Sequence, residues 1–548
     1  VSAGLTPKDS SYTGWEELIH MCLEKEQIAT CAMMTANGDE RFRGLMEYVL
    51  AELDTCQRTN GDGWVGPVRN GKQIFSEIKE GNIRIKFNGH LLNEGKVPWY
   101  NMHKLFAGLI DAYYLTNNQK AKKILVKLAD WTDDLLSGLS YDQVQKMLIS
   151  EHGGMNESLV TVYEITGDTK YLELSKKFNH EKILYPLLKG LDRLNGQHAN
   201  SQIPKIIGVT KQYELTGDSS LLKAAEFFWN TVVRHHTYVN GGNAHKEFLG
   251  PPDQLYNRLD DMTSENCGTY NMLKLTKDLF CIEPTADKAD YYEQGLYNQI
   301  LASQNPENGT GTYFEPLGPG TCRNYYSPDK SFYCCTGTSM EKHSMYSEAI
   351  YFKDPDGGLF INLFIPSELI YKEKGLTLIQ KTDFPYSDHM EYTLRMKRPQ
   401  RMSIYFRIPG WAVQGCSLTI NGERQTVDAK PGSYLEINRE WRDGDSITYQ
   451  VPMSLHTENA LGSNEMKAFL YGPIVLTADL GQGVWQKPYP VIISNDENKE
   501  DLLEKGDEKT LTFTTLTAKP ENVTLKPYFI TIYNTMLTYF SFMNNTEY

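Results

Sequence analysis

The sequence has few features of a membrane protein or a nucleic-acid-binding protein. Its longest apolar stretches, residues 358–366 and 466–480, are shorter than the roughly 20 residues that a membrane-spanning helix needs. The net charge is −14, and no run of Lys and Arg offers a footprint for a phosphate backbone. We therefore expect no membrane span and no nucleic-acid partner.

The sequence also lacks the cysteine spacing of disulfide frameworks and of structural zinc sites. Its nine cysteines are odd in number and irregularly spaced, which argues against a disulfide framework. The C-x-x-C pairs that are typical of structural zinc sites are absent. Cys334 and Cys335 are adjacent, and adjacent cysteines rarely bond each other because the geometry is strained. This pair therefore needs a chemical explanation.

What the sequence does contain, up to about residue 355, is a helical apolar pattern with a recurring turn signal. Asn-Gly-Asp at 37–39 and Thr-Gly-Asp at 166–168 and 216–218 each separate two amphipathic stretches, as do looser turns at 117–118 and 287–288. In such a turn, Gly ends one helix in the left-handed conformation and Asp caps the next. Helical hairpins must stack to bury their apolar faces, so this pattern predicts a superhelix or a closed toroid.

After about residue 356 the apolar period changes to two, which predicts a β-sandwich. The main boundary is expected at residues 352–358, where 353–358 are turn-rich, so we expect a helical domain over 1–355 and a β region over 356–548. The β region forms one module or two, with a second division near 481–509.

Individual strands and turns follow from local patterns in the β region. Asn421-Gly422 is a type I′ hairpin signal, and the charged segment 495–509 predicts a solvated loop. The expected strands are 403–409, 417–425, 434–438, 446–451, 510–515 and 528–533.

The sharpest chemical feature is a set of thiols and one carboxylate. Glu265 and Cys267 lie close together in sequence, and Cys334 and Cys335 follow far downstream. Three sulfurs and one oxygen can form a tetrahedral zinc site, because zinc accepts both ligand types. The alternative, that these cysteines are reduced core residues, has about equal weight from the residues alone.

Several motifs in the same order resemble the β-L-arabinofuranosidases of glycoside hydrolase families 127 and 146. The most specific are SFYCCTGTSMEKH at 331–343 and ENC at 265–267. The other matching segments are PWY at 98–100, HK at 103–104, EHGGMNE at 151–157, HAN at 198–200, YFEPL at 313–317 and RIPGW at 407–411. Together they cover most of residues 4–366 and extend into the β region.

The resemblance implies an (α/α)6 toroid as the catalytic domain, followed by one or two β-sandwich modules. It also implies a retaining exo-glycoside hydrolase that releases β-L-arabinofuranose from plant-type oligosaccharides or polysaccharides. In this family pattern Cys334 matches the nucleophile and Glu247 the general acid/base. Glu265, Cys267, Cys334 and Cys335 match the ligands of a Zn²⁺ cofactor, and the sugar contacts match His103, His152, His198 and Tyr313. From the substrate class we expect a periplasmic or secreted protein.

Alternatives remain open from the sequence. Glu247 lies among Gly, Asn and Lys, so it could be a solvent-facing loop carboxylate. Helical toroids also host glycosidases that use two carboxylates, in which case the cysteines are structural and Glu157 is a further candidate. The early segment 19–27 departs from the family pattern, with Lys25 where relatives carry a second histidine. A non-catalytic carbohydrate-binding relative is therefore a third hypothesis.

Overall fold

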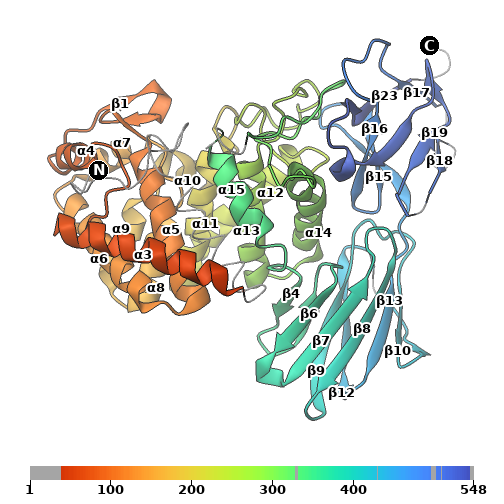
Figure 1. Ribbon diagram of the computed structural model, residues 1–548, viewed down its shortest axis with the longest axis horizontal. Coiled ribbons are helices and arrows are strands. Elements are labelled where there is room, and N and C mark those ends of the chain that lie inside the picture. Colours follow the sequence, from red (N-terminus) through yellow and green to blue (C-terminus); the bar gives the residue numbers. More distant parts are fainter. Residues whose placement is uncertain are drawn as a thin grey trace.

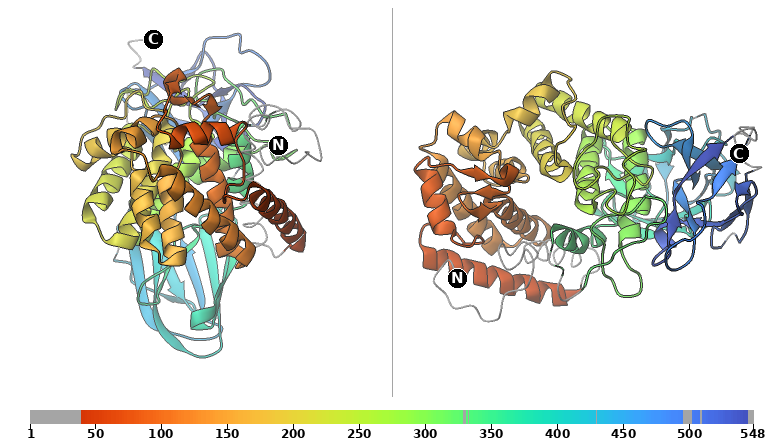
Figure 2. Two further views of the ribbon diagram at one scale, coloured as in Figure 1. Left: turned by 90° about the vertical axis from the view of Figure 1, so that its left-hand side faces the viewer. Right: turned by 90° about the horizontal axis from the view of Figure 1, so that it is seen from above.

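The computed structural model describes residues 39–543, except 328–330, 332, 429, 495–501 and 508. A helical domain comes first, followed by strands β4–β13 and then by a C-terminal module of strands β14–β23 (Figure 1). Seen from above, the C-terminal module lies beside the last helices of the helical domain (Figure 2). Among the described residues, no helix combines the length and apolar character required to cross a membrane. The divergent segment 19–27 lies outside the described residues.

The helical domain is built from consecutive antiparallel pairs of helices. Its helices are α3 (Glu40–Asn60), α4 (Gly71–Lys79), α5 (Pro98–Thr116), α6 (Gln119–Leu136), α7 (Tyr141–Met147), α8 (Met155–Thr166), α9 (Thr169–Lys177), α10 (Glu181–Leu188), α11 (Ala199–Thr216), α12 (Ser219–His235), α13 (Asn266–Ile282), α14 (Ala286–Gly295) and α15 (Cys334–His343). A small sheet of β1 (Ile85–Lys86), β2 (Leu91–Leu92) and β3 (Gly95–Lys96) precedes α5.

The two members of each pair have different surroundings. Helices α5, α8, α11 and α13 pack side by side and bury residues on most of their faces, whereas α6, α9 and α12 keep one face exposed. A wall of buried helices inside a layer of amphipathic ones is the arrangement of a helical toroid. The predicted fold class, a helical toroid followed by β-sandwich modules, is confirmed.

The predicted turn chemistry connects these pairs. Gly167 and Gly217 end α8 and α11 with φ of 75° and 72°, and Asp168 and Asp218 cap the helices that follow through their side chains. At the looser turn after α5, Asn117 takes the left-handed conformation instead of Gly. The last pair differs from the prediction, because Thr285 occupies the N-cap of α14.

Strands β4–β13 form two sheets that enclose one apolar core. Their order is β11-β10-β13-β8-β7-β6 in one sheet and β12-β9-β5-β4 in the other. The strands are β4 (Tyr351–Lys353), β5 (Leu359–Ile361), β6 (Ser367–Tyr371), β7 (Leu376–Thr382), β8 (His389–Met396), β9 (Gln400–Ile408), β10 (Ser417–Ile420), β11 (Glu423–Arg424), β12 (Ser433–Trp441) and β13 (Ser446–Gln450). The hairpin turn between β10 and β11 has positive φ at Asn421 and Gly422, as a type I′ turn requires.

The C-terminal module is a further, separate sheet. Its strands are β14 (Leu455–Asn459), β15 (Met466–Tyr471), β16 (Ile474–Asp479), β17 (Val491–Ile493), β18 (Leu503–Lys505), β19 (Phe513–Thr515), β20 (Ala518–Lys519), β21 (Thr524–Pro527), β22 (Met536–Leu537) and β23 (Tyr539–Met543). Strand pairing therefore changes sheets within residues 451–454, while the domain boundaries at 355 and near 481–509 stay predictions.

The turn expected over 353–358 is present and joins β4 to β5, whereas two other local expectations for the β region need correction. The charged segment 495–509 contains a strand, β18, in its described part. The strand expected over 528–533 is instead a 3₁₀ turn at Tyr528–Ile530, because its carbonyl groups bind the buried Arg323 side chain rather than a neighbouring strand.

The first β-sandwich is joined to the last helical pair by a buried ion-pair network. Arg407, which is fully buried, donates hydrogen bonds to Asp290 Oδ1 at 2.6 Å and to Glu293 Oε1 on α14. Trp411 Nε1 binds the second Glu293 oxygen at 2.9 Å. This contact explains the Arg-Ile-Pro-Gly-Trp motif at 407–411, which joins the sandwich to α14.

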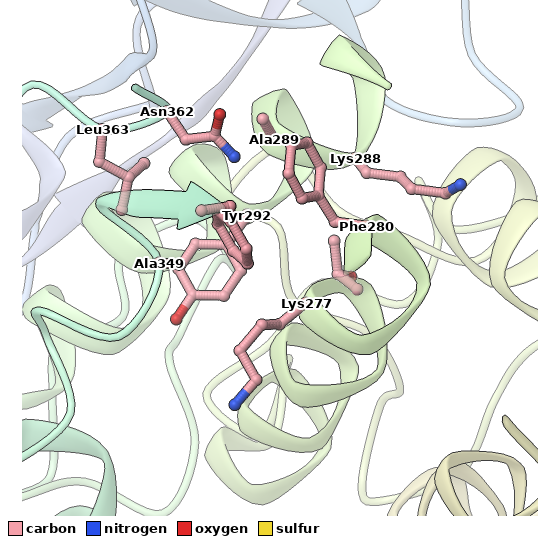
Figure 3. Close-up of a pocket in the computed structure, with 10 residues that line it drawn as sticks. Lys277, Phe280, Lys288, Ala289, Tyr292, Ala349, Asn362 and Leu363 are labelled. Carbon is pink, nitrogen blue, oxygen red and sulfur yellow. The ribbon is translucent and has the colours of Figure 1, made fainter. Parts of the chain in front are cut away.

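Apolar side chains complete the same junction. Phe280 of α13, Tyr292 of α14 and Leu363 after β5 surround a small cavity (Figure 3). The ammonium groups of Lys277 and Lys288 extend away from it, and Lys288 Nζ lies 3.0 Å from a Glu226 carboxylate oxygen. We interpret this cavity as part of the packing between domains.

Candidate active site

The four predicted metal ligands meet where two helices begin. Glu265 is the N-cap residue of α13 and Cys267 lies in its first turn, while Cys334 and Cys335 open α15. Their ligand atoms all lie within 4.8 Å of one another, and all four residues are buried. The positive ends of two helix dipoles therefore converge on this cluster, which favours negatively charged ligand atoms.

The contacts within the cluster are close. The sulfurs of Cys267 and Cys335 lie 3.1 Å apart, and Cys335 Sγ lies 3.6 Å from Glu265 Oε1. A tetrahedral ion with bonds of ~2.3 Å separates its ligands by roughly 3.8 Å, which is compatible with this spacing. The geometry can therefore accommodate one divalent cation with little rearrangement.

Two further observations fit a cation at this position. Glu265 Oε2 is buried and has no hydrogen-bond partner among the described residues. Burial and the neighbouring Cys267 raise the pKa of Glu265 well above its usual value, and burial likewise raises that of Cys335. A bound cation would reverse both effects by pairing with the charged forms. The donor set, three sulfurs and one carboxylate, suits a soft divalent ion.

A tyrosine links the cluster to the predicted acid/base. The Tyr313 hydroxyl donates a 2.5 Å hydrogen bond to Glu247 Oε1 and lies 3.3 Å from Cys334 Sγ. These two distances place Glu247 Oε1 and Cys334 Sγ at most about 6 Å apart, close to the ~5 Å separation of nucleophile and acid in retaining glycosidases. Burial raises the pKa of Tyr313, so its hydroxyl keeps its proton at neutral pH.

The loop that carries Glu247 has an unusual backbone. Ala244, Lys246 and Glu247 have φ of 71°, 51° and 72°, in the left-handed region that non-glycine residues rarely adopt. Each such residue costs on the order of 1–3 kcal/mol and persists only where its surroundings hold it. Glu247 is therefore presented by a constrained loop, and the interpretation as a free solvent-facing carboxylate is not supported by this geometry.

The predicted sugar contacts occupy different environments. His198 Nε2 lies 3.8 Å from Glu247 Oε2, and its ring packs edge-on against Phe248. His103 Nε2 lies 3.9 Å from Glu157 Oε2. The structure thus places His198 beside the acid/base and His103 beside a second carboxylate, and their roles as sugar contacts stay predictions.

His152 is the most deeply buried of the predicted contacts. Its Nδ1 lies 3.0 Å from the Ser150 carbonyl, and its Nε2 is buried without a hydrogen-bond partner among the described residues. Burial lowers the pKa of His152 well below its usual value, so the ring is neutral. A neutral ring can hydrogen-bond a sugar hydroxyl but cannot contribute a positive charge.

The two glycines of the segment 151–157 make room for His103. A Cβ at Gly153 would lie 2.3 Å from His103 Nδ1, and one at Gly154 would lie 3.0 Å from His103 Nε2. Gly153 also has φ of 54°. The imidazole ring therefore requires glycine at 153, while at 154 an added Cβ would meet Glu157 Oε2 at 2.8 Å before the ring.

Some residues at the site had not been identified from the sequence. Thr338 Oγ1 lies 3.0 Å from Cys267 Sγ, and its position one turn after Cys334 on α15 is a signal that could have revealed it. Asp260, in the loop before α13, contacts His245 and Lys246, the two residues that precede Glu247. An Asp-Asp pair in a loop offers no such signal, because it is typical of a solvated turn.

Comparisons with known proteins agree with this geometry. The family model described as "Beta-L-arabinofuranosidase, GH127 catalytic domain" matches residues 1–348, and the GH127 middle-domain model matches residues 358–453. The non-reducing end β-L-arabinofuranosidase of Bifidobacterium longum subsp. longum is 24% identical over 437 residues. That match covers 69% of this chain, and this chain spans 64% of the length of that relative.

Solved structures share the fold over nearly the whole chain. A GH127 β-L-arabinofuranosidase from Geobacillus stearothermophilus T6 has a TM-score of 0.76 at 17% identity, covering 99% of this chain and 93% of the other. A second GH127 β-arabinofuranosidase has a TM-score of 0.76 at 19% identity, with coverages of 99% and 90%. Since the catalytic-domain model alone matches more than half of the sequence, the chain belongs to the GH127 β-L-arabinofuranosidase family.

Proposed function

We propose that this protein is a retaining exo-glycoside hydrolase that releases β-L-arabinofuranose from plant-type glycans. The observation that carries the proposal is the Tyr313 hydroxyl, which contacts both Glu247 and Cys334. A nucleophile and an acid/base in one pocket, about 5 Å apart, are the requirement of the retaining mechanism. The name of the Bifidobacterium longum relative supports the choice of β-L-arabinofuranose.

Zinc is the proposed cofactor, held by Glu265, Cys267, Cys334 and Cys335. When bound, a zinc ion supplies the positive charge that keeps the Cys334 sulfur a thiolate at neutral pH. Thiolate ligands and a single carboxylate favour zinc over the harder magnesium and calcium ions.

In the first step, the Cys334 thiolate attacks the anomeric carbon of the arabinofuranosyl unit. The glycosidic C–O bond breaks as the C–S bond forms, and the carboxylic acid of Glu247 gives its proton to the leaving oxygen. In the second step, the Glu247 carboxylate takes a proton from water, whose oxygen attacks the same carbon. The C–S bond breaks, which restores the thiolate and the protonated Glu247.

In this proposal, the predicted sugar contacts position the terminal arabinose. His103, His152, His198 and Tyr313 hydrogen-bond the hydroxyl groups of the terminal arabinose. Because substrates of this class lie outside the cytoplasm, a periplasmic or secreted location belongs to the same proposal.

An aryl β-L-arabinofuranoside tests the proposal directly. We expect the wild-type protein to hydrolyse it with retention of anomeric configuration, and Cys334→Ala and Glu247→Gln to lose at least about 100-fold in kcat/KM. Cys281→Ala and Glu423→Gln change exposed residues of the same types and should leave turnover unchanged. Mass spectrometry of a trapped glycosyl-enzyme should locate the label on Cys334.

Other outcomes would select the alternatives. Normal turnover in Cys334→Ser, together with an inactive Glu157→Gln or Glu247→Gln variant, would indicate a mechanism with two carboxylates. Binding without turnover across a panel of furanosides and pyranosides would indicate a non-catalytic carbohydrate-binding protein. Either result would reject the cysteine mechanism.

A further inference from the structure

Asp260 lies where three segments of the active site meet. One segment carries Glu247, another leads to Glu265, and the third carries Tyr313. Asp260 belongs to the second segment and contacts both of the others. Its contacts are with residues that neighbour Glu247 and Tyr313, so any effect on the reaction acts through the residues that it holds.

The carboxylate of Asp260 holds the two residues that precede Glu247. Its Oδ2 lies 2.8 Å from His245 Nε2 and 3.2 Å from Lys246 Nζ. Its Oδ1 accepts a 2.8 Å hydrogen bond from the Met262 amide. Both oxygens are thus engaged, one with the loop of Glu247 and the other with its own loop.

Main-chain hydrogen bonds join the same two loops. The Lys246 amide binds the Met262 carbonyl at 3.0 Å, and the Ser264 amide binds the Ala244 carbonyl at 2.9 Å. His245 pairs with Thr263 across this short antiparallel contact. The segment that presents Glu247 is therefore paired with the segment that leads directly to Glu265.

The main chain of Asp260 also holds the loop of Tyr313. Its carbonyl accepts hydrogen bonds of 3.2 Å from the amides of Leu317 and Gly318. A Cβ at Gly318 would lie 2.6 Å from the Asp260 Cα, so only glycine allows the backbones of these two segments to lie so close together. One residue thus fixes the positions of two loops whose side chains meet at the Tyr313–Glu247 hydrogen bond.

The backbone conformation of the Glu247 loop needs contacts of this kind to stabilise it. Its left-handed residues are Ala244, Lys246 and Glu247, and strained backbone relaxes unless other contacts oppose it. Partial burial raises the pKa of Asp260, but the hydrogen bonds from His245 and Met262 hold this pKa below its usual value. The carboxylate is therefore charged at neutral pH. A charged acceptor makes stronger hydrogen bonds than a neutral one.

We propose that Asp260 is a positioning residue for the acid/base, which holds Glu247 within reach of the leaving oxygen by clamping His245 and Lys246. The inference rests on the proposed function, because it assigns Asp260 a part in the proton transfer made by Glu247. It predicts a defect in proton transfer with little change in metal binding or in overall stability.

The test compares Asp260→Asn with Asp253→Asn. Asp253 also pairs with a histidine, His235, at 3.0 Å, but on an exposed surface, so it is a matched control. The substrates are aryl β-L-arabinofuranosides whose leaving groups range from a good one, which needs no proton, to a poor one, which depends on the acid. We expect kcat/KM of Asp260→Asn to fall about 10- to 100-fold for the poor leaving group and much less for the good one.

Zinc content and the unfolding midpoint of each variant separate positioning from folding. Both should match the wild type in Asp260→Asn, whereas Asp253→Asn should match it in every measurement. Lys246→Met removes one arm of the clamp and should give a smaller defect with the same dependence on the leaving group.

Three results would overturn the inference: wild-type rates for the poor leaving group in Asp260→Asn, an equal loss for all leaving groups, or a loss of zinc. Failure of the proposed function gives a different pattern. In that case the wild-type protein does not hydrolyse the substrates, or Glu247→Gln hydrolyses them as well as the wild type does.

Discussion

The Tyr313 hydroxyl donates a hydrogen bond of 2.5 Å to Glu247, and the same oxygen lies 3.3 Å from the sulfur of Cys334. A phenol carries one proton, so Tyr313 can donate it to the carboxylate or to a thiolate, but not to both at once. When Glu247 is protonated in the proposed cycle, the phenol can turn to the sulfur. Tyr313 can therefore donate its proton to whichever of the two reacting groups is charged at a given stage of the cycle.

Replacing Tyr313 with Phe removes this shared donor. A hydrogen bond to a charged group contributes about 1.5–3 kcal/mol, so we expect kcat/KM of Tyr313→Phe to fall about 10- to 100-fold. Steady-state kinetics on an aryl β-L-arabinofuranoside measures the effect. Tyr114→Phe is the control, because the Tyr114 hydroxyl donates a 2.9 Å hydrogen bond to Glu164 on the surface of the helical domain. Equal rates in the two variants would contradict the role given to Tyr313.

Cys335→Ala should weaken metal binding, because it removes one of the four clustered ligands. Losing an outer-shell partner of a metal ligand costs 10- to 100-fold in affinity, so losing a ligand should cost at least about 100-fold. Elemental analysis of purified protein should find one zinc ion per wild-type chain and most of it missing in Cys335→Ala.

The control for this measurement is Cys281→Ala, which alters an exposed cysteine of the same helix that carries Cys267. A chelator should lower the unfolding midpoint of the wild-type protein, because an ion that binds only the folded state stabilises it. A full complement of zinc in Cys335→Ala would show that the cluster is not the zinc site.

The parts of the fold that were predictable from sequence have local causes. Gly167 and Asp168 specify the end of one helix and the start of the next by their own conformational and hydrogen-bonding preferences, whatever lies around them. Asn421 and Gly422 specify a hairpin for the same reason. The expected strand at 528–533 was wrong because its apolar, β-branched composition is overruled by a distant residue, Arg323, which binds its carbonyl groups.

The candidate site divides in the same way. Resemblance to a family identified Glu247 and Cys334 as the acid/base and the nucleophile. Nothing local in either segment indicates that the two side chains share a hydrogen-bond partner in the folded chain. Their proximity results from the stacking of helical pairs and from loops that pair with each other. Asp260 was missed because its importance lies in contacts with residues 15 and 57 positions away, His245 and Leu317.

Gly153→Ala should displace the His103 ring. The new methyl group would lie 2.3 Å from Nδ1, and no side chain at this position can avoid the ring. Small displacements at a binding site can cost up to about 100-fold in activity, so we expect a marked fall in kcat/KM for the arabinofuranoside. Since His103 is a predicted sugar contact, most of this fall should be in KM.

Gly196→Ala is the matched control for this substitution. Gly196 has φ of 76°, so alanine is strained there as it is at Gly153, but no atom lies within 4 Å of its added Cβ. Backbone strain should therefore cost both variants about 1 kcal/mol of stability, the clash should cost Gly153→Ala more, and only Gly153→Ala should lose activity. A parallel loss of activity in both variants would indicate backbone strain rather than displacement of His103.

Arg407→Ala should destabilise the junction between the helical domain and the first sandwich. The guanidinium group is fully buried and binds Asp290, Glu293 and the carbonyl of Asn362. Removing one partner of a buried ion pair leaves the opposite charge without compensation and typically costs 3–5 kcal/mol. Urea unfolding followed by tryptophan fluorescence should therefore show an earlier transition.

The loss should come from the unpaired carboxylates rather than from the missing arginine itself. Arg407→Met with Glu293→Gln removes both charges while keeping most of the volume, so it should recover part of the stability. Arg401→Ala, on the same strand but exposed and bound to Asn438 Oδ1 at 3.0 Å, should lower the free energy of unfolding by less than about 0.5 kcal/mol. If the double variant were no more stable than Arg407→Ala, packing and not charge would explain the contribution of Arg407.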